Sequence, residues 1–145
     1  MIVLNDIELL TCLKILNMLK SEDFYFSNLY MTKNYLTVTE RQSLNILAEE
    51  KKIVLFESGS SFYSFFNKLD AERYPIGLPG MSSVYYAKEN NIPIVTKCRL
   101  TRRLAEEIGV LVYSYEEMLK LINIQQNQID HINNLLLMLE NSQNN

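Results

Sequence analysis

The 145-residue chain has no tryptophan, one histidine, two cysteines, three prolines and four glycines. So little proline and glycine excludes a collagen-like, low-complexity or linker-rich chain. The two cysteines, Cys12 and Cys98, lie far apart and form no C-x-x-C pair. This argues against a thiolate zinc site and favours free, buried thiols in a reducing compartment. The single histidine, His131, is expected at the surface or in an interface.

Long apolar runs and a strong charge of one sign are also missing. No run approaches the roughly 18 residues of a membrane span, and residues 1–6 lack the basic start of a signal peptide. These absences predict a cytoplasmic chain without a membrane segment. The formal net charge of −3 argues against a protein that coats nucleic acid with its whole surface, but it is compatible with a local basic patch.

What is present is an ordinary globular composition at a length that suits one core. Short β-branched or aromatic runs alternate with segments of helical spacing. Strands are predicted at 2–4, 24–26, 53–56, 92–96 and 110–113, and helices at about 7–20, 37–51, 62–69, 84–90 and 100–108. The alternation predicts an α/β fold with a mainly parallel central sheet.

Local signals mark several ends of these elements. Thr37 with Glu40, and Ser114 with Glu117, have the spacing of capping boxes at helix starts. A sharp break is expected at 75–80, where two prolines and two glycines gather. Gly109 suits the cap at the end of a helix.

Polar residues follow two of the predicted strands. Asn5 and Asp6 come directly after the first strand, and residues 96–98 end the fourth. Ligand sites in open parallel sheets lie at the carboxyl ends of the strands. If these two strands are neighbours, Asp6, Thr96 and Lys97 approach one another, and the turn at 96–98 is the predicted functional centre.

The last part of the chain carries a heptad stripe. It predicts one long helix, which divides the chain into a domain at 1–121 and an extension at 122–145 with a frayed end. The stripe either packs on its own domain or pairs with a second copy or another protein, and the sequence leaves both open. Its members are Tyr115, Met118, Ile122, Gln125, Ile129, Ile132, Leu136 and Leu139.

The stretch at 83–112 carries Ala-Lys-Glu on a helix, a strand ending in threonine, then a leucine, an Ala-Glu pair and Gly-Val-Leu-Val. With Val-Leu-Asn-Asp at 3–6, it resembles the PIN domain family, whose members are typically metal-dependent ribonucleases. The resemblance covers residues 2 to about 120. It implies a three-layer sandwich around a mainly parallel sheet, to which this chain adds the extended C-terminal helix.

The family's chemistry needs clustered carboxylates that hold one or two Mg²⁺ or Mn²⁺ ions. The resemblance makes Asp6 the first acid and metal ligand, with Asn5 in its place if the register slips by one. Glu40 is a weaker match for the second acid, and Glu8 stands where the family often has an asparagine. Each acid also has a structural interpretation, Asp6 at a helix N-terminus and Glu40 in a capping box.

Two further acids of the family pattern are missing. The third falls at Gly80 or Met81, and the fourth falls at Lys97 or Cys98. We expect no cofactor, with Mg²⁺ or Mn²⁺ only if the chain is active. One hypothesis is that Lys97 supplies the positive charge of the metal and pairs with Asp6. The alternative is an exposed turn residue.

Basic residues gather after the fourth strand. In a working nuclease, such a cluster would bind phosphates together with Thr96. The alternative is a solvated helix face, balanced by Glu106 and Glu107 four positions further on. The cluster consists of Lys97, Arg99, Arg102 and Arg103.

The leading hypothesis is a degenerate PIN-like domain without efficient nuclease activity. It would act as a binding or regulatory module of toxin–antitoxin descent, with RNA, another protein or a second copy as its partner. One alternative is a weak Mg²⁺- or Mn²⁺-dependent ribonuclease that uses Asp6, Glu40 and further acids such as Asp70 or Glu72. Another is a structural homodimer built on the C-terminal helix.

Overall fold

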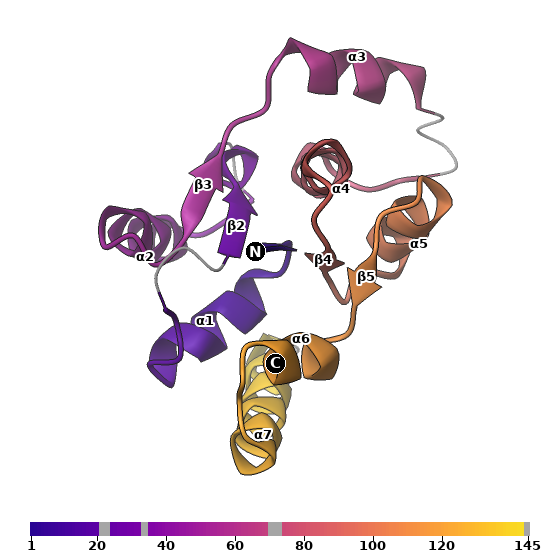
Figure 1. Ribbon diagram of the computed structural model, residues 1–145. Helices are drawn as coiled ribbons and strands as arrows, with labels where there is room; N and C mark the ends of the chain where they lie inside the picture. The colour runs from indigo at the N-terminus through magenta and orange to yellow at the C-terminus, as the bar shows by residue number, and fades with distance from the viewer. Residues whose placement is uncertain (21–23, 33–34, 70–73, 144–145) are drawn as a thin grey trace.

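The computed structural model of the chain describes residues 1–20, 24–32, 35–69 and 74–143 (Figure 1). Within these residues, the strands are β1 (Ile2–Leu4), β2 (Phe24–Ser27), β3 (Val54–Phe56), β4 (Ile94–Val95) and β5 (Val112–Tyr113). The helices are α1 (Ile7–Ile15), the short 3-10 helix η1 (Asn28–Met31), α2 (Val38–Glu49), α3 (Ser60–Lys68), α4 (Leu78–Asn90), α5 (Arg99–Glu107), α6 (Tyr115–Leu121) and α7 (Gln126–Gln143).

The strands form one parallel sheet in the order β3-β2-β1-β4-β5. Helices cover both faces, with α1, α2, α6 and α7 on one side and α3, α4 and α5 on the other (Figure 1). The central strand β1 pairs with β2 on one side and with β4 on the other. The predicted α/β architecture, a helix–sheet–helix sandwich around a parallel sheet, is confirmed.

Side-chain alternation along β1 explains why the sheet carries two cores. Ile2 and Leu4 point into the core shared with α1, α2, α6 and α7, whereas Val3 points into the core shared with α3, α4 and α5. Successive side chains of a strand face opposite sides of the sheet. A strand buried on both faces therefore reads as the continuous apolar run from which it was predicted.

The predicted break at 75–80 is wrong in its position, because α4 already begins at Leu78. Pro79 lies in the first turn of α4, where a missing backbone N–H costs nothing. Gly80 continues the helix, and a Cβ there would lie 3.3 Å from Oγ1 of Thr101. The glycine thus allows α4 and α5 to pack closely instead of breaking the chain.

The remaining boundaries follow the local signals with small shifts. Both capping boxes are present, with hydrogen bonds of 2.9 and 3.1 Å between Thr37 and Glu40. Gly109 follows α5 with a φ of +84°, as the predicted cap requires. Helix α1 ends at Ile15, five residues before the prediction, and Asn17 beyond it has a φ of 54°.

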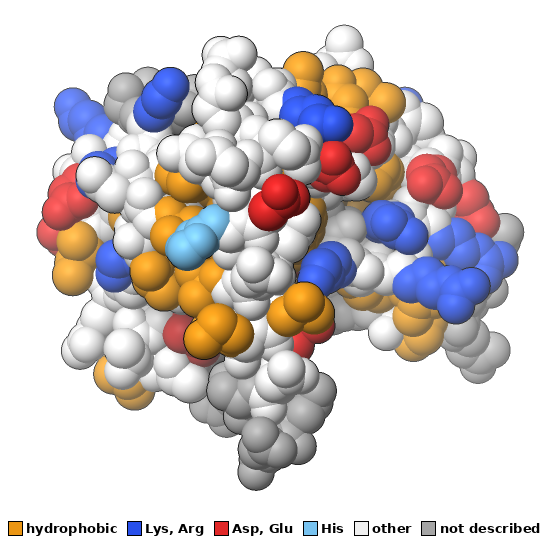
Figure 2. All heavy atoms as spheres, turned by 90° about the horizontal axis from the view of Figure 1, so that it is seen from below, with side chains coloured by type: hydrophobic (Ala, Val, Ile, Leu, Met, Phe, Trp, Pro, Cys, Tyr) orange, Lys and Arg blue, Asp and Glu red, His pale blue; other side chains and the backbone are white. Residues whose placement is uncertain are grey.

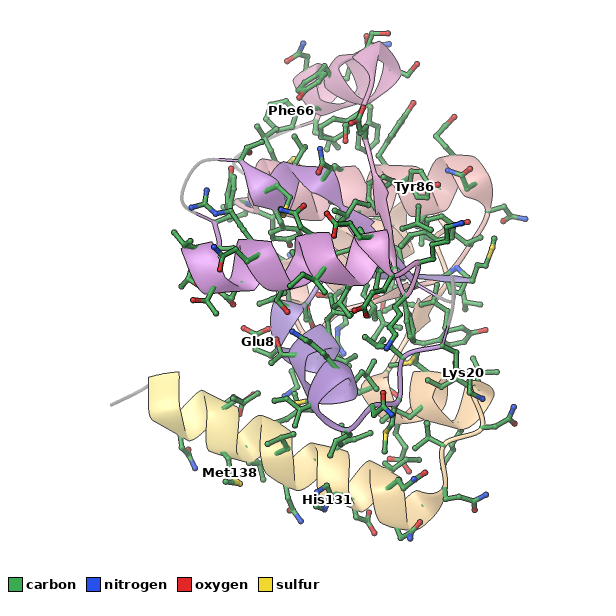
Figure 3. All side chains as sticks on the ribbon, turned by 90° about the vertical axis from the view of Figure 1, so that its left-hand side faces the viewer. Glu8, Lys20, Phe66, Tyr86, His131 and Met138 are labelled. Carbon is green, nitrogen blue, oxygen red and sulfur yellow. The ribbon has the colours of Figure 1, made fainter. Side chains whose placement is uncertain are left out.

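The expected extended C-terminal helix is present as α7, but the prediction that it is continuous from Tyr115 is wrong. The chain turns between α6 and α7, where Asn123 has a φ of 66°, so the heptad stripe is split. The predicted domain boundary at 121 and 122 falls at this turn. Helix α7 then lies along α1 (Figure 3).

The stripe residues of α7 pack on the chain's own domain. Ile129, Ile132 and Leu136 are buried in the same core as α1. His131 and Met138 point away from the body (Figure 3), and His131 is exposed, as predicted. Among the described residues, no helix is long and apolar enough to cross a membrane.

Candidate functional site at the strand ends

The carboxyl ends of β1 and β4 lie side by side because the two strands pair in parallel, with Leu4 opposite Val95. The next residues of each strand therefore meet at one edge of the sheet. The prediction that Asp6, Thr96 and Lys97 approach one another is confirmed by direct hydrogen bonds.

Three donors from the chain itself bind the carboxylate of Asp6. The hydroxyl of Thr96 donates to Oδ1 at 2.8 Å, and the backbone N–H of Lys97 donates to Oδ2 at 2.6 Å. The hydroxyl of Tyr115, at the start of α6, donates to Oδ2 as well. Asp6 thus joins β1 to the turn after β4 and to α6.

The environment of Tyr115 keeps its hydroxyl protonated. Burial raises the pKa of Tyr115 well above its usual value, and the negative charge of Asp6 and the hydrogen bond to it add to the effect. The hydroxyl is therefore a permanent donor at any physiological pH.

The ammonium of Lys97 binds Glu140, in the last turn of α7, at 2.8 Å and lies 5.3 Å from the ring centroid of Tyr115. The hypothesis that this ammonium pairs with Asp6 is wrong, because Lys97 reaches Asp6 through its backbone N–H. Both side chains of the ion pair are about half exposed, at 53% and 45%.

A second set of hydrogen bonds orders the floor of the site. Asn5 is buried, accepts a hydrogen bond from the hydroxyl of Tyr30 at 2.6 Å and donates to Oγ1 of Thr96 at 3.3 Å. The N–H of Cys98 donates to the same Oγ1 at 3.1 Å. Burial, followed by the charge of Asp6, raises the pKa of Tyr30.

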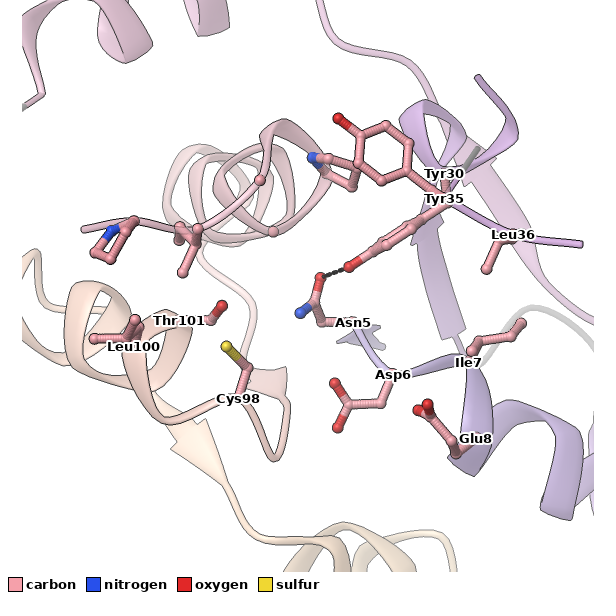
Figure 4. Close-up of a pocket in the computed structure, with 15 residues that line it drawn as sticks. Asn5, Asp6, Ile7, Glu8, Tyr30, Tyr35, Leu36, Cys98, Leu100 and Thr101 are labelled. Carbon is pink, nitrogen blue, oxygen red and sulfur yellow. Dashed lines mark hydrogen bonds between the residues drawn. The ribbon is translucent and has the colours of Figure 1, made fainter. Parts of the chain in front are cut away.

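A cavity of about 510 Å³ opens in front of this network (Figure 4). Asp6 and Glu8 stand at one side of it, and Gly80 of α4 forms part of its wall. No lysine, arginine or histidine is among the described residues that line it. Gly80, one of the two positions where the resemblance expects a third acid, therefore faces the cavity but has only a hydrogen atom as its side chain.

The two thiols differ in environment. Cys12 is buried, as predicted, and burial raises its pKa to about 11, which keeps it unreactive. The prediction of a buried thiol is wrong for Cys98, which is exposed and lines the same cavity. Its sulfur points toward the cavity in Figure 4.

Glu40 does not join the other predicted site residues. Its carboxylate accepts the N–H of Thr37 within the capping box and lines a groove between α1 and α2. It is absent from the described walls of the strand-end cavities. Asp70 and Glu72 lie outside the described residues.

The basic residues of α5 are exposed, and Figure 2 shows Lys and Arg side chains gathered on the side of the molecule where α5 lies. Arg103 pairs with Glu107 at 3.3 Å along the helix. Arg102 lines a separate cavity of about 450 Å³ together with Lys97 and Tyr115. Arg99, at the start of α5, is exposed.

At the strand ends, the described residues form no carboxylate cluster of the kind that a nuclease uses to hold magnesium or manganese. Such ions need several free oxygen ligands, whereas Asp6 already accepts three hydrogen bonds. Within the described part of the chain, no group of three or more histidine, cysteine, aspartate or glutamate side chains is placed to hold a metal ion.

Sequence reasoning missed Tyr30, Tyr115 and Glu140 as partners of the site. Tyr115 lies two residues after the end of β5, at the same edge of the sheet, so its position did carry a signal. In the stripe, it was interpreted only as an apolar member. Glu140 carried no signal, because its approach to Lys97 depends on the turn between α6 and α7.

Comparison with known proteins supports the fold alone. No protein-family model and no curated protein matches the chain. A solved structure of a PilT N-terminus domain protein from the hyperthermophilic archaeon Sulfolobus solfataricus P2 is similar, with a TM-score of 0.52. The match covers 87% of this chain and 97% of that chain at 14% identity. The chain therefore has a PIN-like fold, the fold of PilT N-terminus domains.

Proposed function

We propose that this PIN-like chain is a degenerate domain, a binding or regulatory module without efficient nuclease activity. The hydrogen bonding of Asp6 is the observation that supports this most directly. A carboxylate that accepts hydrogen bonds from a hydroxyl, a backbone amide and a phenol has few lone pairs left to bind a divalent cation. Mg²⁺ also dehydrates reluctantly and depends on free carboxylates.

The neighbouring positions support the same conclusion. Gly80 faces the 510 Å³ cavity where a third acid would be needed, and Met81 is buried. Lys97 and Cys98 follow β4 where the resemblance requires a fourth acid. A positively charged side chain at this edge opposes binding of a second cation.

The proposed partner is RNA or another protein, in keeping with descent from a toxin of the toxin–antitoxin kind. Thr96, Lys97 and the exposed arginines of α5 would contact phosphates. Because Arg103 is already paired with Glu107, Arg99 and Arg102 would contribute more of the salt-dependent binding.

A pairing of two copies through α7 stays a prediction. The buried members of the heptad stripe already pack on α1, so pairing would use the outer side chains Leu137 and Met138, which are 56% and 66% exposed. Sedimentation equilibrium of the double variant Leu137→Glu/Met138→Glu against the wild type tests this. Equal masses at the monomer value would count against a dimer on this face.

One observation favours the alternative of a weak metal-dependent ribonuclease. Asp6 and Glu8 line the same cavity at the strand ends (Figure 4). Two carboxylates bind Mg²⁺ weakly unless substrate phosphates complete its coordination.

An RNA-cleavage assay decides between the two. Purified chain is incubated with single-stranded RNA and Mn²⁺ beside the Asp6→Asn variant, whose side chain keeps the same shape. We expect no cleavage above the level of the variant. Manganese-dependent cleavage by the wild type, lost in a folded Asp6→Asn variant, would establish the ribonuclease and overturn the proposal.

A further inference from the structure

Lys97 lies between two cavities of opposite charge. The first, of about 340 Å³, is lined by the acids Asp6, Glu8 and Glu140 with Lys97 as its cation. The second, of about 450 Å³, places Lys97 and Arg102 against one acid, Glu116. The side chain of Lys97 therefore borders both the acid-lined cavity and the cavity lined by basic residues.

The backbone of Lys97 is held in place, whereas its half-exposed ammonium can exchange one ion-pair partner for another. Its backbone N–H is bound to Asp6, and its ammonium lies over the ring of Tyr115, which lines both cavities. Among the described residues, this ammonium forms its ion pair with Glu140.

Glu140 is placed to be displaced. It belongs to the last turn of α7, three residues before the described helix ends at Gln143. Last helical turns lack part of their backbone hydrogen bonds, and ion pairs between half-exposed side chains are weak. An anion that offers Lys97 a stronger contact can therefore replace this carboxylate.

We propose that Glu140 is an internal competitor that holds Lys97 on the acid-lined side, and that a phosphate group in the 450 Å³ cavity displaces it. Such a group would bind Lys97 and Arg102 together. Two cations of this kind suit the several acceptor oxygens of a phosphate better than a single carboxylate does. Ser114 and Asn133 also line the cavity, and a hydroxyl and a side-chain amide are groups that can donate to a phosphate. The proposal rests on the proposed function, since it assigns ligand chemistry and regulation to the same edge of the sheet.

Titration of the ¹⁵N-labelled full chain with inorganic phosphate, followed by NMR at constant ionic strength, tests this. We expect the amide signals of Lys97, Ser114 and Asn133 to shift, and Glu140→Gln to lower the Kd for phosphate at least threefold. The matched control is Glu89→Gln, which removes the same charge from an exposed site on α4 and should leave the Kd unchanged. Arg102→Gln should raise the Kd severalfold.

Equal Kd values for Glu140→Gln and Glu89→Gln would overturn the proposal that Glu140 competes with phosphate for Lys97. Amide signals that shift only on other surfaces would show that phosphate does not bind in the 450 Å³ cavity, which would overturn the proposed site. Acetate at matched ionic strength is the second arm, and binding as tight as that of phosphate would overturn the assignment of a phosphate group. These readouts involve no RNA cleavage, so manganese-dependent cleavage would refute the proposed function while the titration still decides the role of Glu140.

Discussion

Asp6 and Glu40 are two carboxylates at the starts of helices, yet they stabilise the molecule in different ways. Glu40 accepts a backbone N–H three residues away, within the first turn of α2. Asp6 precedes α1 but makes no capping hydrogen bond with its side chain. It accepts donors 90, 91 and 109 positions away.

The difference separates a local role from a tertiary one. The capping box at Glu40 holds one end of one helix, whereas Asp6 ties together β1, the turn after β4 and α6. A carboxylate that accepts hydrogen bonds from three distant segments stabilises the tertiary fold. The comparison predicts a graded series of effects on stability.

Asp6→Ala should have the largest effect. It leaves the hydroxyl of Thr96, the N–H of Lys97 and the phenol of Tyr115 without their acceptor. Hydrogen bonds to a charged group contribute roughly 1.5–3 kcal/mol each and are not additive, so we expect a loss of about 2–4 kcal/mol in the free energy of unfolding. Urea denaturation at pH 7 measures it. A loss below about 1 kcal/mol would show that the network contributes little.

Tyr115→Phe removes one of the three donors and should cost about 1–2 kcal/mol. It also changes the response to alkali. Because the pKa of Tyr115 is raised in the folded chain, the unfolded tyrosine loses its proton first, near pH 10. Stability from this group is therefore complete below pH 10 and is lost as the pH rises above it. Urea midpoints between pH 8 and 11 should fall less steeply for Tyr115→Phe, and parallel curves would contradict the assignment.

Glu40→Ala should cost about 0.5–1 kcal/mol, the usual range for a capping interaction. The second capping box provides the matched control, because Glu117 makes the equivalent bond to the N–H of Ser114. The two alanine variants should lose similar stability in the same urea assay. A loss at Glu40 as large as that of Asp6→Ala would place this residue in a tertiary network after all.

Elements specified by neighbouring residues were predictable from the sequence. The capping box at Thr37, the cap at Gly109 and the buried run of β1 all occur as expected. Each depends on residues a few positions apart. The parallel sheet also followed, because alternating strands and helices leave few connections. The sequence left open whether β1 and β4 are neighbours, which the structure shows them to be.

Features that depend on distant contacts were not predictable. The heptad stripe suggested one helix, but a turn at Asn123 lets α7 fold back along α1 and bury its apolar side chains. Pro79 and Gly80 suggested a break, but both fit inside α4. The partnership of Lys97 with Glu140 follows from that fold-back, and no spacing along the chain encodes it.

The smallest expected effect belongs to the ion pair of Lys97 with Glu140. A double-mutant cycle with Lys97→Gln and Glu140→Gln should give a coupling of about 0.5 kcal/mol or less, because both side chains are half exposed. The coupling should fall further in high salt, since exposed charges are screened. The pair of Arg103 with Glu107, also on the surface, gives the reference value. A coupling above about 1.5 kcal/mol would mean that Glu140 locks α7 onto the strand ends, and an anion could then displace it only at a comparable cost.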